Sequence, residues 1–411
     1  MTQAAQRAHR PLFLIAVVAT AIGAALLPAS AAARWQTTWL ISKDRGGGIP
    51  NGPSSHGVIS GDKRYARLIA FQSEASDLVG GDRNGHSDIF AIRRAGSFSN
   101  DGEPWRPGKT QLVSRGRGGK PANGPSFAPS VDGNFYAPPK CIAFLSAASN
   151  LVRNDSNGKV DAFLVRRGKL RRVSYVNGHQ ARSAVTHVAV SGDCTRTAFV
   201  MDGRLFVRKG GRTMKIKAKP NAADPSFGVG EHNRLVLGAE GGVYLLEEMS
   251  RHPRKVASGR NPGFNDLRRN VVTYEAKRGE HWQVAYKDLG HGERIVSRYD
   301  GELGNADSRS PVVANSGYYI GFESHASNLG TRADRRRKDV NGTHDTYLYT
   351  GVRNLTLVES VDPNQYGVPL PGGGRNPSIS FYSNYFMFDS PAPLGSDAGE
   401  HQVFMRYLGG K

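Results

Sequence analysis

The sequence predicts an all-β protein, a β-propeller of about seven four-stranded blades. Three observations predict it. One order of apolar strand and polar turn recurs along the chain, and alternating strand patterns far outnumber helical ones after residue 33. Turn-forming residues are also frequent, with 50 Gly and 22 Pro in 411 residues. Four-stranded units repeated along a chain are typical of propeller blades.

The repeat is clearest in three copies. In the first, Ser60-Gly61-Asp62 precedes the apolar segment Leu68–Ser73, and a polar turn leads to Asp88-Ile89-Phe90. The second copy has the same order around Cys141–Ser146, and the third around Tyr319–Ser324. Shorter copies that have lost the polar turn lie between and after them. Each unit therefore offers a first strand, an apolar second strand, an alternating third strand and a short fourth strand.

The third strands set the number of blades. We expect them near seven residues: Ile89, Ala162, Leu205, Val243, Val284, Thr346 and Val403. The seventh ends close to residue 411 and has no fourth strand after it. Thr37–Ser42 matches the fourth-strand pattern of Gln111–Ser114, so we expect the N-terminal strand to complete the last blade. Closure of this kind removes exposed sheet edges. A six-bladed ring, with two of the short units merged, is the alternative.

At this point the chain resembles a known family. The pattern of Ser60-Gly61-Asp62, Ile69-Ala70-Phe71 and Asp88-Ile89-Phe90 is similar to the repeats of TolB-type, WD40-like β-propellers of bacterial envelopes. The resemblance covers most of the chain after residue 33 and implies the fold. Such propellers serve as protein-binding platforms, as appendages of peptidases and as lyases, so the resemblance selects no single function.

The N-terminus has the pattern of a secretory signal peptide. Arg7 and Arg10 precede an uncharged apolar run, Leu12–Leu27, and small residues surround Ala31 and Ala33. We expect residues 1–33 to be removed and residues 34–411 to form one propeller domain that is secreted or periplasmic. An uncleaved membrane anchor is the alternative, but the run is short for a span of about 20 residues. No later run is long and apolar enough to cross a bilayer.

The chain is strongly basic, with 55 Lys and Arg against 35 Asp and Glu and a formal charge of +20. Without Arg7 and Arg10 the charge is +18, so polyanions outside the cytoplasm are expected partners. Basic residues alternate along one segment, at Lys209, Arg212, Lys215, Lys217 and Lys219. They form either the solvated face of a strand or part of a groove for a polyanion. No specific nucleic-acid module is present.

A polar turn, Asp-x-Asn-Gly-x-x-Asp, occurs three times. Oxygen ligands at alternate positions of a tight turn suit a hard cation such as Ca²⁺. The candidate Ca²⁺ ligands are Asp82, Asn84 and Asp88, then Asp155, Asn157 and Asp161, then Asp339, Asn341 and Asp345. The alternative is a hairpin turn in which Asn-Gly supplies positive φ angles and Asp accepts backbone N–H groups.

The two cysteines, Cys141 and Cys194, precede the core strands of consecutive units. Consecutive blades would bring them near each other, and export would permit a disulfide. Two separate buried thiols are the alternative.

The sequence favours a binding protein over an enzyme. Neither Gly-x-Ser-x-Gly nor His-Glu-x-x-His occurs. We expect a monomer that recognises a protein or an anionic polymer through loops on one face. The runner-up is a polysaccharide-acting lyase or hydrolase with its site in the central channel, and a third reading is a structural envelope protein. A channel with convergent His and carboxylate groups would favour the enzyme, and one lined by Ser, Thr and Gly would favour binding.

Overall fold

The computed structural model describes residues 38–408, apart from 63–64, 97–104, 134–137, 231, 249, 268, 331–338, 340, 352–354, 362–367 and 395–398. The predicted signal peptide lies outside the described residues, as does the basic run at 335–338. Within the described part of the chain, no helix is long and apolar enough to cross a membrane.

The strands form seven four-stranded antiparallel sheets, each meandering outward from its first strand. The first strands are β2 (Ser54–Ile59), β6 (Ser126–Val131), β12 (Val185–Val190), β16 (Ala223–Phe227), β20 (Arg260–Asn265), β26 (Ser308–Val313) and β30 (Arg375–Ile379). The second strands are β3 (Leu68–Ser73), β7 (Cys141–Ser146), β13 (Arg196–Met201), β17 (Leu235–Ala239), β21 (Val271–Arg278), β27 (Tyr319–Ser324) and β31 (Tyr385–Pro391). The third strands are β4 (Asp88–Arg94), β8 (Asp161–Arg166), β14 (Arg204–Lys209), β18 (Gly242–Leu246), β22 (His281–Asp288), β28 (Asp345–Thr350) and β32 (His401–Tyr407).

The fourth strands are β5 (Pro107–Leu112), β9 (Lys169–Arg172), β15 (Arg212–Lys215), β19 (Arg254–Ala257), β23 (Gly292–Ile295), β29 (Leu355–Val358) and β1 (Thr38–Leu40). We number the blades 1 to 7 in the order of their first strands. Two small hairpins join blades 2 and 3 and blades 5 and 6: β10 (Tyr175–Val176) with β11 (His179–Gln180), and β24 (Arg298–Tyr299) with β25 (Glu302–Leu303). One short 3₁₀ turn, η1 (Arg117–Gly119), follows β5.

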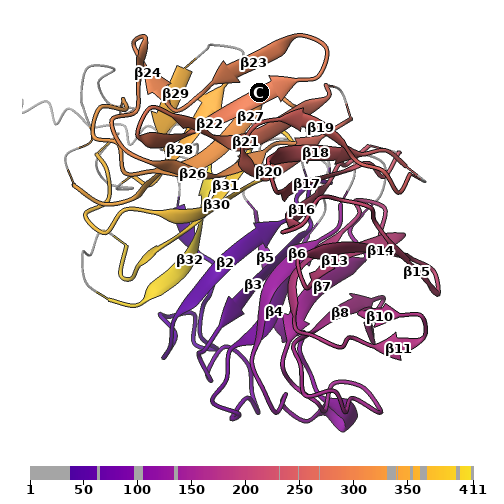
Figure 1. The fold of residues 1–411 in the computed structure, drawn as a ribbon. Coiled ribbons are helices and arrows are strands. Elements are labelled where there is room, and N and C mark those ends of the chain that lie inside the picture. The colour runs from indigo at the N-terminus through magenta and orange to yellow at the C-terminus, as the bar shows by residue number, and fades with distance from the viewer. Residues whose placement is uncertain are drawn as a thin grey trace, which may run out of the picture.

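The blades follow one another around a closed ring, and the prediction of seven blades is confirmed (Figure 1). All seven expected third strands are present, so the six-bladed alternative is wrong. The N-terminal β1 pairs with β32, with Trp39 opposite Met405, so the predicted closure is also confirmed. The yellow strands β30 to β32 lie beside the indigo β2, where the two ends of the ring meet.

The second and third strands are buried on both faces, which explains their nearly continuous apolar sequences. Every residue of β7 and of β13 is buried. Aromatic side chains on paired strands stack inside the blades, with ring centroids 5.7 Å apart for Phe144 and Phe163 and 5.5 Å for Phe322 and Tyr347. Adjacent blades bury these faces against each other, so the ring has a core between every pair of sheets.

The repeated Ser-Gly-Asp turn has a role at the axis. Ser60 and Asp62 accept backbone N–H groups of Leu68 and Arg67, which fixes the turn between β2 and β3. Gly61 lies so close to blade 6 that an added Cβ would stand 1.8 Å from Nδ2 of Asn315. The same Nδ2 donates to the Gly61 carbonyl oxygen at 2.8 Å. A side chain at residue 61 would displace the Asn315 amide, and the turn links two non-adjacent blades at one end of the channel.

Candidate functional site

The first acidic turn is built around Asp88, the first residue of β4. Its carboxylate accepts hydrogen bonds from Ser114 Oγ and, at 2.5 Å, from Asn84 Nδ2. Asn84 Oδ1 accepts the backbone N–H of His86 at 3.0 Å. Burial raises the pKa of Asp88 to about 6, and the nearby carboxylate of Asp82 adds to this. In this turn Asp88 accepts side-chain donors, Asn84 accepts the backbone N–H group, and Gly85 has a positive φ of 65°.

The third turn repeats this arrangement. Asp345 accepts from Ser360 Oγ and from Asn341 Nδ2, the latter at 2.8 Å. Burial and the neighbouring carboxylate of Asp339 hold the pKa of Asp345 well above its usual range. Tyr347 Oη also donates to Asp339, at 3.3 Å. Blades 1 and 6 thus each place two buried carboxylates side by side.

The second turn differs because it contains a guanidinium. Arg172 at the end of β9 is buried and donates from Nη1 to Asp155 at 2.8 Å and to Asp161 at 3.3 Å. Asp161 also accepts from Ser174 Oγ and Asn157 Nδ2, like its counterparts. The residues in the place of Arg172 are aliphatic in the other two blades: Leu112 and Val358. One of the three predicted cation sites therefore holds a positive charge from the chain itself.

The central channel is a cavity of about 380 Å³ lined by the first strands. Its described lining is mostly small or apolar and includes Ser130, Ser226 and Ser378, together with Asn261 and Asn315. Asp224 is the one carboxylate among those lining residues, and its Oδ1 lies 3.2 Å from Nε2 of His187 on β12.

Three carboxylates outside the predicted site residues lie between blades 5, 6, 7 and 1. Each accepts the backbone N–H of a residue in the next first strand: Glu275 from Ser310 at 3.0 Å, Glu323 from Asn376 at 3.1 Å and Asp389 from His56 at 2.8 Å. Gln72 does the same for Ala128 at 3.0 Å. The acceptors thus lock successive blades together.

The residues that donate to these acceptors share an unusual backbone conformation. Ser310, Asn376, His56 and Ala128 all have φ between 51° and 53°. The register of each first strand shifts at the same place, so each marks a β-bulge. A signal in the sequence could have found the acceptors, because each follows an aromatic residue near the end of a second strand: Phe71-Gln72, Tyr274-Glu275, Phe322-Glu323 and Phe388-Asp389.

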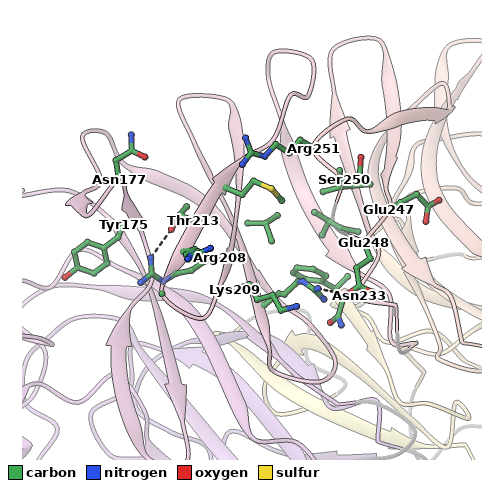
Figure 2. A pocket seen from close by; sticks show the side chains of 18 of the residues that line it. Tyr175, Asn177, Arg208, Lys209, Thr213, Asn233, Glu247, Glu248, Ser250 and Arg251 are labelled. Carbon is green, nitrogen blue, oxygen red and sulfur yellow. Dashed lines mark hydrogen bonds and ion pairs between the residues drawn. The ribbon is translucent and has the colours of Figure 1, made fainter.

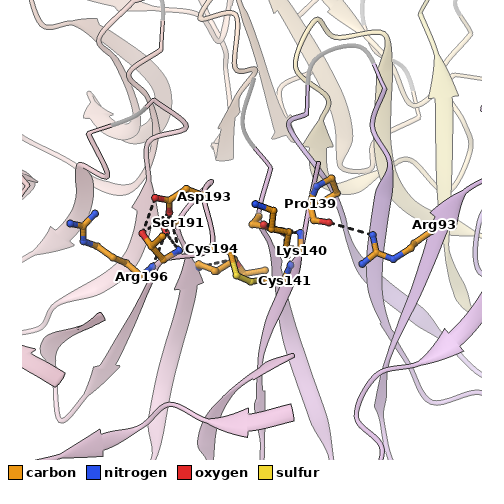
Figure 3. The surroundings of a disulfide bond; sticks show 12 residues. Arg93, Pro139, Lys140, Cys141, Ser191, Asp193, Cys194 and Arg196 are labelled. Atoms are coloured by element: carbon orange, nitrogen blue, oxygen red, sulfur yellow. Dashed lines mark hydrogen bonds between the residues drawn. A yellow bond between two sulfur atoms is a disulfide. The ribbon is translucent and has the colours of Figure 1, made fainter. Parts of the chain in front are cut away.

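The two cysteines lie at the boundary of blades 2 and 3 (Figure 3). Cys141 begins β7, Cys194 lies in the turn between β12 and β13, and a disulfide joins them with Cα atoms 6.0 Å apart. Both residues are buried. Asp132 lies beside them and accepts the backbone N–H of Cys141 at 2.8 Å, and burial raises its pKa to about 6. The bridge ties the inner strands of consecutive blades.

A larger cleft, of about 860 Å³, lies between blades 3 and 4 (Figure 2). The turn between β14 and β15 and the connection between β18 and β19 form its sides, and the hairpin β10–β11 contributes Tyr175. Its floor is apolar and comprises Val207, Met214, Phe227, Leu235 and Leu246.

Small side chains at the blade 3–blade 4 boundary explain this cleft. Val207 of β14 faces the next blade at the position that Tyr286 occupies in β22, and Leu246 of β18 corresponds to Tyr349 of β28. Between blades 5 and 6 those two tyrosines pack with ring centroids 6.0 Å apart. Between blades 3 and 4 Val207 and Leu246 occupy those positions, and the space remains open.

The rim of the cleft is cationic. Arg208, Lys209, Arg212 and Arg251 line it, and among the described residues none of these has a carboxylate within 4.0 Å. The two acids of the rim are already paired, Glu248 with Arg196 and Glu247 with Arg254. Two of the alternating basic residues seen in the sequence, Lys209 and Arg212, thus lie beside an apolar cleft, as a groove for an anionic ligand requires.

At low sequence identity, the chain is similar to solved structures that include β-propellers. No protein-family model matches the chain, and no curated protein matches it. Among solved structures, the β-propeller domain of the Trilobed protease from Pyrococcus furiosus is 9% identical, with a TM-score of 0.49 over 87% of this chain and 94% of that one. A TolB-type protein from Agrobacterium tumefaciens is 11% identical, with a TM-score of 0.41 over 73% and 94%.

An acylaminoacyl peptidase from Pyrococcus horikoshii is 9% identical, with a TM-score of 0.48 over 86% of this chain and 51% of the peptidase.

Proposed function

We propose that this chain is an exported, non-enzymatic binding protein that recognises an anionic partner, and that the cleft between blades 3 and 4 is its binding site. The observation that carries the proposal is the cationic rim. Arg208, Lys209, Arg212 and Arg251 surround an apolar floor without carboxylate partners in the described part of the chain. Cations concentrated around a low-dielectric surface focus the attraction of an anionic ligand.

The burial of Arg208 supports this role. Its guanidinium donates to Thr213 Oγ1 at 2.9 Å and lies over the ring of Tyr175, 5.6 Å from the centroid. Burial lowers the pKa of Arg208, so its positive charge is held at a cost in the free protein. An anionic group bound nearby would offset that cost. Rim cations of this kind accelerate association and give it a strong salt dependence.

The runner-up, a polysaccharide lyase or hydrolase, would need catalytic side chains in the channel. Glu275, Glu323 and Asp389 lie on second strands, and each accepts a backbone N–H group of the next blade. Asp224, which lines the channel, lies 3.2 Å from Nε2 of His187. A glycosidase needs a pair of carboxylates free to act on the sugar. Residues 1–33 support export, because their pattern is that of a signal peptide.

The test is retention of the purified, exported chain on immobilised polyglutamate, heparin and neutral dextran. We expect salt-dependent retention on both polyanions and none on dextran. Retention that is equal on all three, or independent of salt, would contradict the proposal. Release of new reducing ends or unsaturated sugars from acidic polysaccharides would favour the runner-up enzyme instead.

A further inference from the structure

The cleft holds one buried cation with an unused donor. Arg196, at the start of β13, is only 6% exposed and lines the cleft. Its Nη2 donates to Glu248, but its Nη1 has no hydrogen-bond partner. A buried guanidinium N–H without a hydrogen-bond partner destabilises the free protein. An oxygen atom of a ligand in the cleft would accept a hydrogen bond from Nη1 of Arg196. The cleft therefore favours a ligand with an oxygen acceptor beside its apolar group.

The arrangement of the cations limits the shape of the ligand. Lys209 and Arg251 lie on different sides of the opening, and Arg208 lies toward Tyr175 (Figure 2). An amphiphile with a single head group places its charge at one end of an apolar tail, so it would leave most of these cations unpaired. A chain with carboxylates on both sides of an apolar group would engage them on more than one side.

The floor specifies a bulky apolar group in the middle of that chain. Tyr286 and Tyr349 fill the equivalent boundary between blades 5 and 6, and Val207 and Leu246 leave it unfilled here. Because Val207 and Leu246 are smaller than the two tyrosines, the boundary between blades 3 and 4 has room for an apolar side chain. A peptide supplies such a side chain from an extended backbone and carries carboxylates on its neighbours. A partly buried edge next to β15 also suits an extended strand.

We propose that the cleft binds an extended acidic peptide segment of a partner protein, with a Leu or Phe side chain on the Val207–Leu246 floor and flanking carboxylates on the rim cations and Arg196. This rests on the proposed function and names its ligand class. Aromatic or aliphatic anchors in a pocket, ringed by charge pairs, are the usual source of affinity in such contacts.

The experiment measures fluorescence anisotropy of a dye-labelled peptide, Glu-Glu-Leu-Phe-Glu-Glu, on the exported chain. We expect saturable binding that weakens at least tenfold when Gln replaces every Glu, and at least tenfold when Ser replaces Leu and Phe. Val207→Tyr with Leu246→Tyr copies the filled boundary of blades 5 and 6 and should also weaken binding at least tenfold.

A second variant tests the rim independently of the floor. Arg212→Glu with Arg251→Glu should lose binding, and Lys169→Glu with Arg171→Glu, an exposed pair on β9 with the same change of charge, should retain it. Circular dichroism and a thermal melt check that each variant is folded. Binding that is unchanged in both cleft variants would overturn the inference.

Two further outcomes separate this inference from the proposed function. Retention on polyglutamate without binding of the peptide would overturn the peptide and leave the anionic partner standing. Failure of both would overturn both. A third outcome would be that the peptide does not bind, whereas dodecanoate binds to the wild type and more weakly to Val207→Tyr with Leu246→Tyr. The occupant would then be an amphiphile, and the peptide proposal would be wrong.

Discussion

Nη1 of Arg172 lies 2.8 Å from Oδ1 of Asp155, inside a turn whose counterparts in blades 1 and 6 have no basic residue in that place. Blade 2 therefore supplies its own cation, and the other two turns keep pairs of buried carboxylates. The predicted Ca²⁺ sites separate on this basis into one that is internally neutralised and two that are not.

The first prediction concerns Arg172→Leu, which copies Leu112 of blade 1. Removal of one partner from a buried ion pair leaves uncompensated charge, and we expect a loss of about 3–5 kcal/mol in the free energy of unfolding, measured by urea denaturation. Arg171→Leu, an exposed neighbour, is the control and should change stability little. A loss of under about 1 kcal/mol in Arg172→Leu would mean that the guanidinium is dispensable.

The second prediction concerns calcium. If Asp82 with Asp88 and Asp339 with Asp345 bind Ca²⁺, millimolar Ca²⁺ raises the Tm and a chelator reverses the rise, because a ligand of the folded state stabilises it. We expect Asp88→Asn and Asp345→Asn to reduce the shift and Asp161→Asn to leave it unchanged. Equal melting curves with Ca²⁺ and with chelator would show that all three turns are hairpin chemistry alone.

The third prediction concerns pH. Burial raises the pKa of Asp389 to about 7, so the folded protein binds a proton there that the unfolded chain releases. This contribution to stability is fully present below about pH 4 and is lost as the pH rises through about 7. Asp88 and Asp132, with pKa values of about 6, act in the same direction.

Asp389→Asn isolates this effect. The variant removes the titration, so its urea midpoint should fall less than that of the wild type between pH 5 and pH 8. An unchanged difference between the two pH values would show that Asp389 does not titrate in this range.

The fourth prediction concerns the disulfide. The bridge joins residues 53 apart in sequence, and closure of a loop of that length is worth about 4 kcal/mol in the chain-entropy model. Dithiothreitol should lower the Tm of the wild type and leave that of Cys141→Ser with Cys194→Ser unchanged. Two free thiols detected in the exported protein by alkylation and mass measurement would contradict the bridge.

The fifth prediction concerns export. The intact mass of the protein recovered from the periplasm or medium should begin after Ala31 or Ala33. A membrane-bound product that retains residues 1–33 would favour the anchor instead.

Most of the fold could be predicted from local sequence patterns. The seven third strands and the closing strand at Thr38–Leu40 follow from apolar alternation and turn residues, which are properties of short segments. The cleft could not be predicted in this way. It depends on what is missing between Val207 and Leu246, two residues from different blades, compared with Tyr286 and Tyr349 in another pair. Such a comparison requires the register of every strand and the neighbour of every blade.

The side chains that accept backbone N–H groups of the next blade could be predicted only in part. Gln72, Glu275, Glu323 and Asp389 follow aromatic residues in the sequence, and their partners are the bulged residues of the next first strands. The aromatic–acceptor pairs can be found in the sequence. Their hydrogen-bond partners cannot, because only the folded ring brings the backbone N–H groups of the next blade close to them.

The most direct test of the binding site is hydrogen–deuterium exchange of the exported chain with and without polyglutamate. We expect slower exchange in residues 205–215 and 244–257, which form the two sides of the cleft. Slower exchange confined to the first strands around the channel, with these segments unchanged, would contradict the proposed binding site.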